Sequence, residues 1–448
     1  MVINWGMAKK VYIETYGCQM NVYDSELVSS ILQKDGFEQT EKAEEADLIL
    51  INTCSVRENA EQRVFGRLDF FKSLKKKRKW LVIGVLGCMA ERLKEKLLEH
   101  PAVDLVAGPD SYRDLPKLVS AMAEGGSHIN TLLSHTETYA DISPVRMNDG
   151  GVSGFISIMR GCNNVCSYCI VPYVRGSERS RDPRSIVREA CEMFEAGYRE
   201  VNLLGQNVDS YLYEDNAAGS KVTFANLLEM VAAVDPALRV RFATSHPKDM
   251  SDEVLYAMAK HPNICKHIHL PVQSGSNEVL EKMNRKYTVE TYLQRIAKIR
   301  EVLPECGITT DVIVGFCGET ADDFQKTLDL FRLVGYDWAF MFAYSQRPNT
   351  KAARHFADDV TAEEKERRLQ QMIDLQAGLS LEKHQKCLGQ CYEVLVEGPS
   401  KKDPQQLSGR TSQNRVCVFP AEGHKPGDYV TVRVESCTPA TLIGTIVK

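Results

Sequence analysis

Short apolar runs alternate with amphipathic segments over the first part of the chain. Val11–Tyr16 alternates apolar and polar positions, while Leu48–Asn52 and Leu81–Leu86 are almost continuously apolar, as in strands buried on both faces of a parallel sheet. A helical pattern follows each run, over Asp24–Lys34, from Arg57 to about Lys75, and from Glu91. The pattern predicts an N-terminal domain over residues 9–125, with a parallel sheet and helices on both faces.

A second strand–helix series predicts another domain over residues 148–380. Six apolar runs separated by helical patterns are candidate strands: Gly154–Met159, Glu200–Leu204, Arg239–Ala243, His267–Val272, Thr309–Val314 and Trp338–Tyr344. Six strands rather than eight indicate a partial (βα)6 barrel. In barrels of this kind the chemistry lies at the carboxyl ends of the strands.

The periodicity changes near the end of the chain. A charged helical pattern covers Thr361–Gln390, and short β-type segments separated by Gly, Pro and Ser follow it: Tyr392–Glu397, Arg415–Val418, Tyr429–Val434 and Thr441–Val447. This predicts a small all-β barrel over residues 381–448. The expected fold class is therefore α/β, with a parallel-sheet domain, a partial barrel and a small β-barrel.

Composition narrows the functional classes. The 448 residues include 14 cysteines, and 55 basic residues stand against 60 acidic ones, so any RNA contact must come from local patches. The start of the chain has no apolar leader segment, and the apolar stretch Trp80–Ala90 is too short to cross a bilayer. We therefore expect a cytoplasmic protein that keeps its thiols for metal, with no membrane partner.

Three cysteines share one loop after the first strand of the second series. Cys162, Cys166 and Cys169 are separated by three residues and then by two. Three thiolates can hold three irons of a 4Fe–4S cube and leave the fourth iron open, and S-adenosylmethionine is the obvious ligand for it; zinc usually takes four ligands in paired C-x-x-C units. Tyr168 lies inside the last pair, where it either faces the cofactor or packs under the loop.

Cys18, Cys54 and Cys88 are isolated in sequence, but each lies just past the carboxyl end of a predicted strand. Because those ends meet at one edge of a parallel sheet, the three thiols are expected to converge there. The alternative is three buried structural thiols, since free cysteine is often simply core. Their equivalent positions favour a second metal site.

Polar clusters follow several strands of the predicted barrel. Each is also compatible with an ordinary turn, because Gly, Asn and Ser dominate turns. Together, at one end of one barrel, they favour a small-molecule site. Its candidate residues are Gly205, Gln206, Asn207, Ser245, Gln273 and Ser274.

Several motifs resemble a known family. The cysteine loop, with G-Q-N at Gly205–Asn207 and G-F-C-G-E at Gly315–Glu319, resembles the radical S-adenosylmethionine enzymes. The runs Y-G-C-Q-M-N, N-T-C-S-V-R-E-N and G-C-M-A-E-R around the three isolated cysteines are similar to the methylthiotransferases among them, above all to the branch that acts on dimethylallyl-adenosine in tRNA. The last domain resembles the RNA-binding TRAM domain. The resemblance covers nearly the whole chain from Lys9; Cys317, Asn349 and Lys351 depart from its pattern near the barrel mouth.

The resemblance implies a specific reaction. The cluster on Cys162, Cys166 and Cys169 cleaves S-adenosyl-L-methionine to a 5′-deoxyadenosyl radical, which removes hydrogen from carbon 2 of N(6)-dimethylallyladenosine at position 37 of tRNA. A second 4Fe–4S cluster on Cys18, Cys54 and Cys88 carries the sulfur, which is methylated and transferred. All six cysteines are then catalytic and metal-binding, and Tyr168 and the strand-end residues bind the cofactor. The implied partners are a tRNA anticodon stem-loop, an electron donor and a sulfur source.

Basic residues provide candidate RNA contacts. Arg175, Arg179 and Arg181 follow the cysteine loop and are expected to meet substrate phosphate or the cofactor carboxylate, while Arg410 and Arg415 in the last domain are expected to contact the RNA backbone. The run Lys75–Lys79 is either a phosphate contact or a solvated helix end.

Two other functions compete with this interpretation. One is the same chemistry on threonylcarbamoyl-adenosine or on a ribosomal protein, and the motifs around Cys18 and Cys54 argue against it. The other is a non-catalytic RNA-binding protein with structural zinc.

Overall fold

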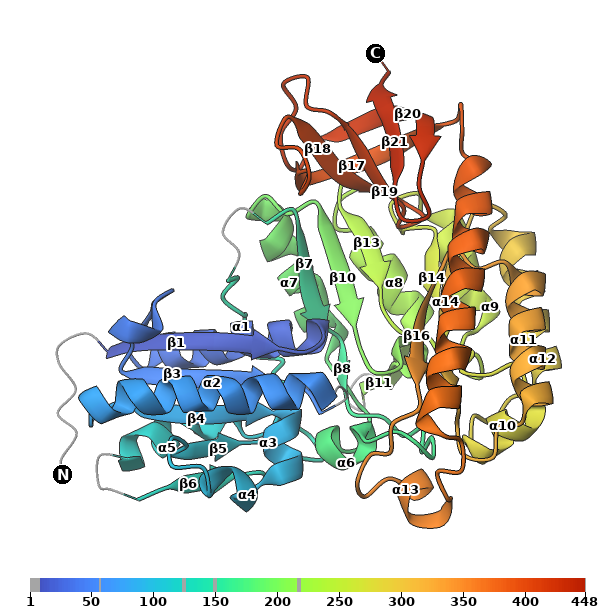
Figure 1. Ribbon diagram of the computed structural model, residues 1–448. Helices are drawn as coiled ribbons and strands as arrows, with labels where there is room; N and C mark the ends of the chain where they lie inside the picture. Colours follow the sequence, from blue (N-terminus) through green and yellow to red (C-terminus); the bar gives the residue numbers. More distant parts are fainter. Residues whose placement is uncertain (1–8, 56–57, 123–125, 148–150, 216–218, 448) are drawn as a thin grey trace. The chain divides into compact units, whose positions relative to one another are not determined.

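The computed structural model describes residues 9–55, 58–122, 126–147, 151–215 and 219–447 (Figure 1). Arg57 and residues 148–150, where the second helix and the second domain were expected to begin, lie outside these ranges, as does Lys448. The chain forms two compact units. The first comprises the described residues of Met1–Asp149 together with Met159–Asn163 and Ile170–Ser185; the second comprises those of Gly150–Ile158, Asn164–Cys169 and Ile186–Lys448.

A six-stranded sheet forms the centre of the first unit, in the order β2-β1-β3-β4-β5-β6, and every neighbouring pair is parallel. The strands are β1 (Lys9–Tyr16), β2 (Phe37–Gln39), β3 (Leu48–Thr53), β4 (Val82–Gly87), β5 (Leu105–Ala107) and β6 (His128–Asn130). The predicted parallel sheet is thus confirmed. β2, β5 and β6 were missed because three residues are too few for a periodic signal.

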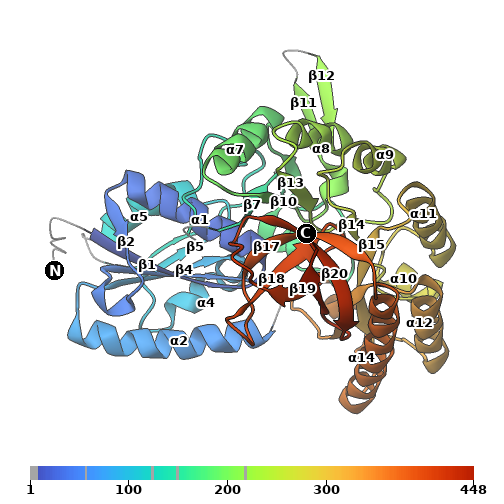
Figure 2. The same cartoon turned by 90° about the horizontal axis from the view of Figure 1, so that it is seen from above.

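Helices cover both faces of this sheet, as Figure 2 shows. α1 (Gln19–Lys34) and α5 (Leu115–Ala121) pack on one face, and α2 (Glu58–Lys77), α3 (Cys88–Leu93) and α4 (Glu95–Leu98) on the other. Each face buries its own apolar core, with Leu48 and Leu50 of β3 on one side and Ile49 and Ile51 on the other. This alternation explains why β3 is apolar throughout.

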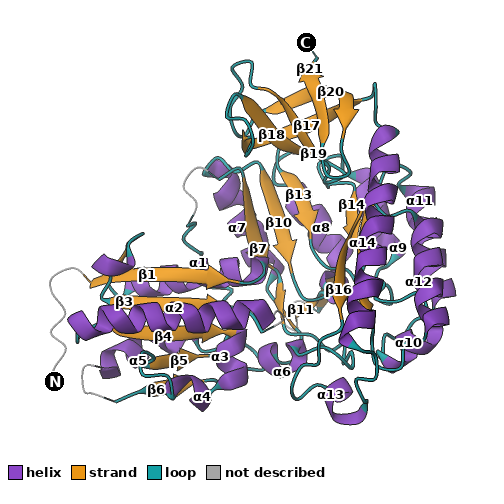
Figure 3. Cartoon of the chain, viewed as in Figure 1, coloured by secondary structure: helices purple, strands orange, loops and turns teal. Residues whose placement is uncertain are grey.

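Six parallel strands in two groups of three line the second unit, in the orders β13-β10-β7 and β14-β15-β16 (Figure 3). They are β7 (Ser153–Ser157), β10 (Glu200–Leu204), β13 (Arg239–Phe242), β14 (His267–His269), β15 (Gly307–Val314) and β16 (Trp338–Ala343). A parallel bridge between Val240 and Ile264 extends the first group. All six predicted strands are present, so the predicted partial barrel is confirmed.

Helices separate these strands along the chain, and the last two helices follow β16. They are α6 (Val171–Arg175, in the first unit), α7 (Pro183–Glu195), α8 (Phe224–Ala232), α9 (Asp252–Lys260), α10 (Asn277–Lys282), α11 (Val289–Val302), α12 (Ala321–Val334), α13 (Lys351–His355) and α14 (Ala362–Gln385). Two short antiparallel pairs were not predicted: β8 (Met159–Arg160) with β9 (Arg179–Ser180), and β11 (Leu212–Asp215) with β12 (Ser220–Thr223). Among the described residues, no helix is both long and apolar enough to cross a membrane.

The C-terminal residues form a closed five-stranded barrel in the order β17-β18-β19-β21-β20. Its strands are β17 (Cys391–Pro399), β18 (Gln406–Thr411), β19 (Val416–Pro420), β20 (Tyr429–Cys437) and β21 (Leu442–Ile446). The predicted small barrel is confirmed, but β18 was missed. Its Gly409 resembles a turn residue in sequence, whereas a Cβ at this position would overlap the Leu395 carbonyl oxygen of β17.

Candidate functional site

Strand register brings the three isolated cysteines to one edge of the first unit's sheet. Tyr16 of β1 pairs with Thr53 of β3, and Thr53 pairs with Gly87 of β4. Cys18 lies two residues past its strand, whereas Cys54 and Cys88 each lie one residue past theirs. Three thiols that are far apart in sequence therefore follow three adjacent, aligned strand ends.

Gly17 and Gly87 directly precede Cys18 and Cys88, and they allow neighbouring strand ends to approach closely. Gly17 has φ +144°, and a Cβ there would lie 2.6 Å from the Cβ of Cys54. Gly87 has φ +87°, and a Cβ there would overlap Asn52 Oδ1 and lie 2.7 Å from the Thr53 carbonyl oxygen. Only glycine fits both the space and the backbone conformation.

Local charges and hydrogen bonds act on the thiols in different ways. A hydrogen bond with Cys54 lowers the pKa of Cys18 to about 6, and the nearby Arg175 adds to this effect against the cost of burial. Burial raises the pKa of Cys88, although Arg175 opposes it. Cys18 also precedes α1, where its backbone N–H donates to Asn21 Oδ1 at 3.4 Å. The helix therefore begins at Gln19 and not at the predicted Asp24.

A buried carboxylate in α1 binds two arginines that flank the cysteine loop in sequence. Asp24 is fully buried and accepts hydrogen bonds from Arg160 Nη1 at 2.9 Å and from Arg175 Nη2 at 2.8 Å. Burial alone would raise the pKa of Asp24, but the two guanidinium groups hold it below its usual value. Arg175 Nε also donates to Cys88 Sγ at 3.2 Å. The sequence analysis did not single out Asp24 or Arg160.

The three arginines expected to meet substrate phosphate or the cofactor carboxylate are buried in the first unit. Arg175, Arg179 and Arg181 are 3 %, 7 % and 2 % exposed. Arg179 forms an ion pair with Asp110 at 2.8 Å, and Arg181 donates to the Tyr23 hydroxyl at 3.0 Å. Protein groups surround all three, and their contact with substrate phosphate or the cofactor carboxylate stays a prediction.

The cysteine loop is shared between the two units. Cys162 belongs to the first, where its N–H donates to the Gly176 carbonyl at 3.1 Å, while Cys166 and Cys169 belong to the second. Within the second unit, Ser167 donates from its N–H to Met283 O at 3.0 Å and from its hydroxyl to Lys282 O at 2.7 Å. The short segment of chain between these cysteines limits how far apart the three thiols can lie.

A buried arginine also contacts this second cysteine set. Arg285 Nη1 lies 3.3 Å from Cys166 Sγ, Nε donates to the Tyr287 hydroxyl at 3.0 Å, and Nη2 donates to the Pro271 carbonyl at 3.0 Å. Its partners are neutral or sulfur groups, and within the described part of the chain it forms no ion pair with a carboxylate. Arg285 was missed because its position, after α10, carries no strand-end or cysteine signal.

Tyr168 is half-buried beside this arginine. Its hydroxyl lies 3.4 Å from Arg285 Nη1, and its ring meets the Phe316 ring edge-on, with the centroids 6.4 Å apart. These contacts support the packing role of Tyr168. Its contact with the cofactor stays a prediction.

The predicted strand-end residues of the barrel are mostly buried. Asn207 Nδ2 donates to Asp249 Oδ2 at 2.8 Å, and Gln273 has a left-handed backbone with φ +70°. The side-chain oxygens Gln206 Oε1 and Asn207 Oδ1 are buried and have no hydrogen-bond partner among the described residues. Buried polar atoms normally have a hydrogen-bond partner. These two acceptor oxygens therefore suit a ligand that carries several hydrogen-bond donors, such as the amino and ribose groups of S-adenosylmethionine.

Gly205, Ser245 and Ser274 occupy the same strand ends. Gly205 directly follows β10, Ser245 donates its N–H to the His269 carbonyl at 3.0 Å, and Ser274 Oγ lies 3.4 Å from Thr327 Oγ1. The bonds of Ser245 and Ser274 reach β14 and α12, and the cofactor contacts of all three residues stay predictions.

A charged group that the sequence analysis did not single out lies next to these residues. Asp209 is partly exposed, but its Oδ1 atom is buried, and its Oδ2 atom accepts from the backbone N–H of His246 at 3.0 Å. Burial raises the pKa of Asp209 to about 7. Burial, with Arg285 and Lys248, lowers the pKa of His246 to about 2, so this imidazole is neutral at physiological pH.

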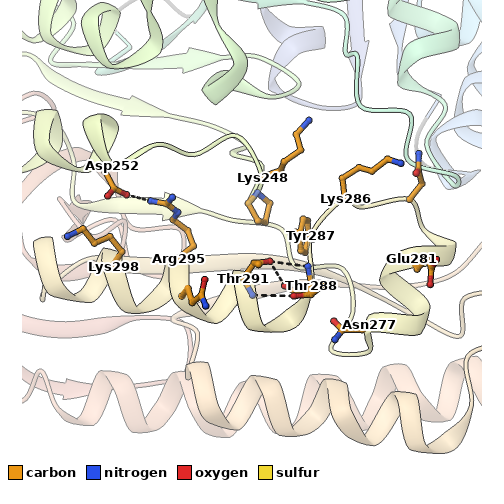
Figure 4. Close-up of a pocket in the computed structure, with 13 residues that line it drawn as sticks. Lys248, Asp252, Asn277, Glu281, Lys286, Tyr287, Thr288, Thr291, Arg295 and Lys298 are labelled. Carbon is orange, nitrogen blue, oxygen red and sulfur yellow. Dashed lines mark hydrogen bonds and ion pairs between the residues drawn. The ribbon is translucent and has the colours of Figure 1, made fainter.

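A pocket of about 870 Å³ opens beside the cysteine loop in the second unit (Figure 4). Two of its lining residues hold that loop: Lys248 Nζ donates to Asn164 Oδ1 at 3.2 Å, and Asn284 Nδ2 donates to Val165 O at 2.8 Å. Its charged lining consists of Lys248, Lys286, Arg295, Lys298, Asp252 and Glu281. Basic residues thus outnumber acidic ones on a chain that is acidic as a whole.

The other predicted RNA contacts are partly engaged with the protein. Arg415 pairs with Asp337 at 2.9 Å, which attaches the small barrel to the rest of the second unit. Arg410 pairs with Glu397 at 3.0 Å and stays partly exposed. In the run Lys75–Lys79, Lys75 pairs with Asp104 and Arg78 with Asp47. Arg415 therefore has a structural role, whereas Arg410 retains access to solvent.

The three thiols of each cysteine set are the type of donor that iron–sulfur clusters take. No group of three or more His, Cys, Asp or Glu among the described residues has the spacing for a single ion. A cube needs wider spacing, because each thiolate binds a different iron. Around Cys18, Cys54 and Cys88, the buried Arg175 Nη1 has no hydrogen-bond partner in the described structure. One N–H donor thus remains beside the thiols for a sulfur-rich anion.

Three family models match successive parts of the chain. They are described as uncharacterized protein family UPF0004 (residues 10–108), Radical SAM superfamily (156–331) and TRAM domain (385–447).

Curated proteins named tRNA-2-methylthio-N(6)-dimethylallyladenosine synthase are similar over nearly the full length. That of Bacteroides fragilis is 55% identical over 97% of this chain and 95% of its own, and that of Bacteroides thetaiotaomicron is 56% identical over 97% and 96%. The protein of Amoebophilus asiaticus is 56% identical over 98% of this chain and 93% of its own.

Solved structures with low sequence identity share the fold. The radical S-adenosylmethionine methyltransferase TsrM from Kitasatospora setae, with a tryptophan substrate and a cofactor analogue bound, superimposes with a TM-score of 0.58 at 15% identity, over 88% of this chain and 79% of its own. The cobalamin-dependent S-adenosylmethionine radical enzyme OxsB gives a TM-score of 0.54 at 14% identity, over 82% and 56%.

Proposed function

Because the chain belongs to the tRNA-2-methylthio-N(6)-dimethylallyladenosine synthases within the radical SAM superfamily, we propose that it adds a methylthio group to carbon 2 of N(6)-dimethylallyladenosine at position 37 of tRNA. It is a transferase that uses S-adenosyl-L-methionine and 4Fe–4S clusters. The single observation that carries the proposal is the identity of 55–56% with these curated proteins over 97–98% of the chain. This identity does not support the two predicted alternatives, which were another substrate and a structural zinc protein.

We assign the two clusters to the two cysteine sets. Cys162, Cys166 and Cys169 would hold the cluster that binds S-adenosylmethionine, and Cys18, Cys54 and Cys88 would hold the auxiliary one. When bound, these groups supply the one-electron chemistry that breaks an aromatic C–H bond and the sulfur that replaces the hydrogen. Acid–base residues offer no such route, because an aromatic C–H has no usable proton.

The chain's own residues position and shield these groups. Ser167 fixes the loop backbone on Lys282 and Met283, and the Tyr168 ring seals the loop against Phe316. The side-chain oxygens of Gln206 and Asn207 would accept hydrogen bonds from the cofactor. Burial of this surface excludes water from a reactive intermediate.

We also propose where the RNA backbone lies. The TRAM barrel is the RNA-binding domain, and the pocket of Figure 4 adds a basic surface beside the cysteine loop. Lys286 is exposed and has no hydrogen bond or ion pair within the described part of the chain, so it is free to meet a phosphate. The protein is expected to act in the cytoplasm, where tRNA is modified.

A competition between three substrates tests the function. Reconstituted protein, S-adenosylmethionine and a strong reductant are incubated anaerobically with tRNA bearing dimethylallyl-adenosine, tRNA bearing threonylcarbamoyl-adenosine, and the ribosomal protein. Mass spectrometry should find the methylthio group on the dimethylallyl nucleoside alone. A gain on either other substrate would refute the proposed specificity.

The RNA surface is tested by one charge reversal. Lys286→Glu should weaken tRNA binding by about 3- to 10-fold and lower the slope of affinity against salt by about one counterion. Lys117→Glu, at an exposed position of α5 that also has no ion pair within the described residues, is the matched control and should change little. Equal losses in the two variants would exclude a phosphate contact in the pocket.

A further inference from the structure

Each cysteine set has one buried arginine that donates a hydrogen bond to one of its sulfurs. Arg175 Nε is 3.2 Å from Cys88 Sγ, and Arg285 Nη1 is 3.3 Å from Cys166 Sγ. Both side chains are buried, at 3 % and 5 % exposed. Because both side chains are buried, each N–H is directed at its sulfur inside the protein.

The two arginines differ in what balances their charge. Arg175 shares the Asp24 carboxylate with Arg160, whereas the described partners of Arg285 are the sulfur of Cys166, two phenol hydroxyls and a backbone carbonyl. A buried guanidinium without a counter-charge is costly, because it has left water. The negative charge of a ligated thiolate and its cluster would offset this cost.

We infer that Arg175 and Arg285 are positioning residues that raise the reduction potentials of the two iron–sulfur clusters. Hydrogen bonds and positive charge at a ligating sulfur stabilise the added electron of the reduced cluster. Arg285, which has no carboxylate partner, should have the larger effect. The inference rests on the cluster assignments proposed above.

The experiment uses full-length chains that hold one cluster each. Changing Cys162, Cys166 and Cys169 to alanine leaves the auxiliary set, and changing Cys18, Cys54 and Cys88 to alanine leaves the loop set. Iron and sulfide per chain are measured first, and the reduction potential is then followed by electron paramagnetic resonance under potentiometric control. This readout does not depend on catalysis.

Arg175→Met should make the reduction potential of the auxiliary cluster more negative. The expected shift is at least a tenfold change in the oxidised-to-reduced ratio, which corresponds to about 59 mV for one electron. Arg160→Met is the matched control, because Arg160 is also buried and shares Asp24 but has no hydrogen bond to a cysteine within the described part of the chain. It should reduce the stability of the fold and leave the potential unchanged. Equal shifts in the two variants, or no shift in either, would overturn the role of Arg175.

Arg285→Met should shift the loop cluster in the same direction and by more. Arg175→Lys and Arg285→Lys keep the charge but lose the fixed donor geometry, and intermediate potentials are expected for them. If a methionine variant no longer holds iron, the lysine variant decides, and an unchanged potential there refutes the inference. A parent chain without iron would instead overturn the cluster assignment, and with it the role of its arginine.

Discussion

The two cysteine sets are assembled in opposite ways. Cys18, Cys54 and Cys88 come from three strand ends, and the register Tyr16–Thr53–Gly87 aligns them. Cys162, Cys166 and Cys169 come from one loop, where the chain itself limits their separation. The first site therefore depends on the whole sheet being folded, whereas the second depends on the anchoring of a short segment. Sheet register can thus replace sequence proximity in building a site.

Two carboxylates, Asp24 and Asp209, differ in the charged groups around them. Asp24 in the first unit binds two arginines, which hold its pKa low. Asp209 in the second unit forms no ion pair within the described residues, and its pKa rises to about 7. Partners, rather than burial alone, decide whether such a group is charged.

The largest expected effect separates the two cysteine sets by function. Cys166→Ala should abolish cleavage of S-adenosylmethionine while leaving iron on the auxiliary set. Cys54→Ala should leave the cleavage and stop sulfur insertion. The measurements are 5′-deoxyadenosine release and methylthio-nucleoside by mass spectrometry. Methylthiolated RNA from the Cys54→Ala protein would show that the two-cluster assignment is wrong.

Asp24→Ala should cost about 3–5 kcal/mol of unfolding free energy, because it leaves two buried arginines without their shared carboxylate. Urea unfolding measures the loss. Asp141→Ala removes an exposed partner of Arg113 and should cost at most about 1 kcal/mol. Similar losses in the two variants would mean that the buried network contributes no more than a surface pair.

Gly87→Ala should cost about 1–3 kcal/mol and reduce iron on the auxiliary set, because its Cβ collides with the end of β3. Gly36→Ala is the matched control, since Gly36 also has a positive φ, of +83°, but no atom lies within 4 Å of the added Cβ. The control should show only the backbone strain and retain its iron. Unchanged iron in Gly87→Ala would mean that the strand ends tolerate a looser approach.

A pH dependence of stability is expected from Asp209. Because the folded-state pKa of Asp209 is raised to about 7, above its ordinary value near 4, folding takes up a proton between these values. Stability should therefore fall as pH rises from about 4 to 7, by up to about 1.4 kcal/mol per pH unit. Asp209→Asn should flatten this dependence in chemical unfolding at several pH values. An unchanged slope would place the titration elsewhere.

Periodicity predicted the elements that carry most of the fold. The buried strands β3 and β4, the six strands of the barrel and the closed C-terminal barrel all have patterns long enough to read. β18 was hidden by Gly409, whose lack of a side chain serves close strand packing and not a turn. Local pattern cannot distinguish these two uses of glycine.

The surroundings of the cysteines were harder to predict than the cysteines themselves. The strand ends pointed to Cys18, Cys54 and Cys88 because topology repeats along the chain. The contact between Asp24 and Arg175 joins residues 151 positions apart, and no periodic signal records it. The same holds for Arg285 and Cys166, which are 119 positions apart. Charge networks that surround a site depend on tertiary packing that sequence patterns do not contain.

The shared Asp24 carboxylate has a consequence for biosynthesis. Its partners, Arg160 and Arg175, are made well after the sheet that contains the first cysteine set, and both belong to the same compact unit as that sheet. A ribosome must therefore release the chain through Ser185 before this unit can be completed. A nascent or truncated chain that stops near residue 147 would keep an uncompensated carboxylate inside its core. Cluster loading is expected to follow synthesis of the second set's loop, and not to begin when the sheet first emerges.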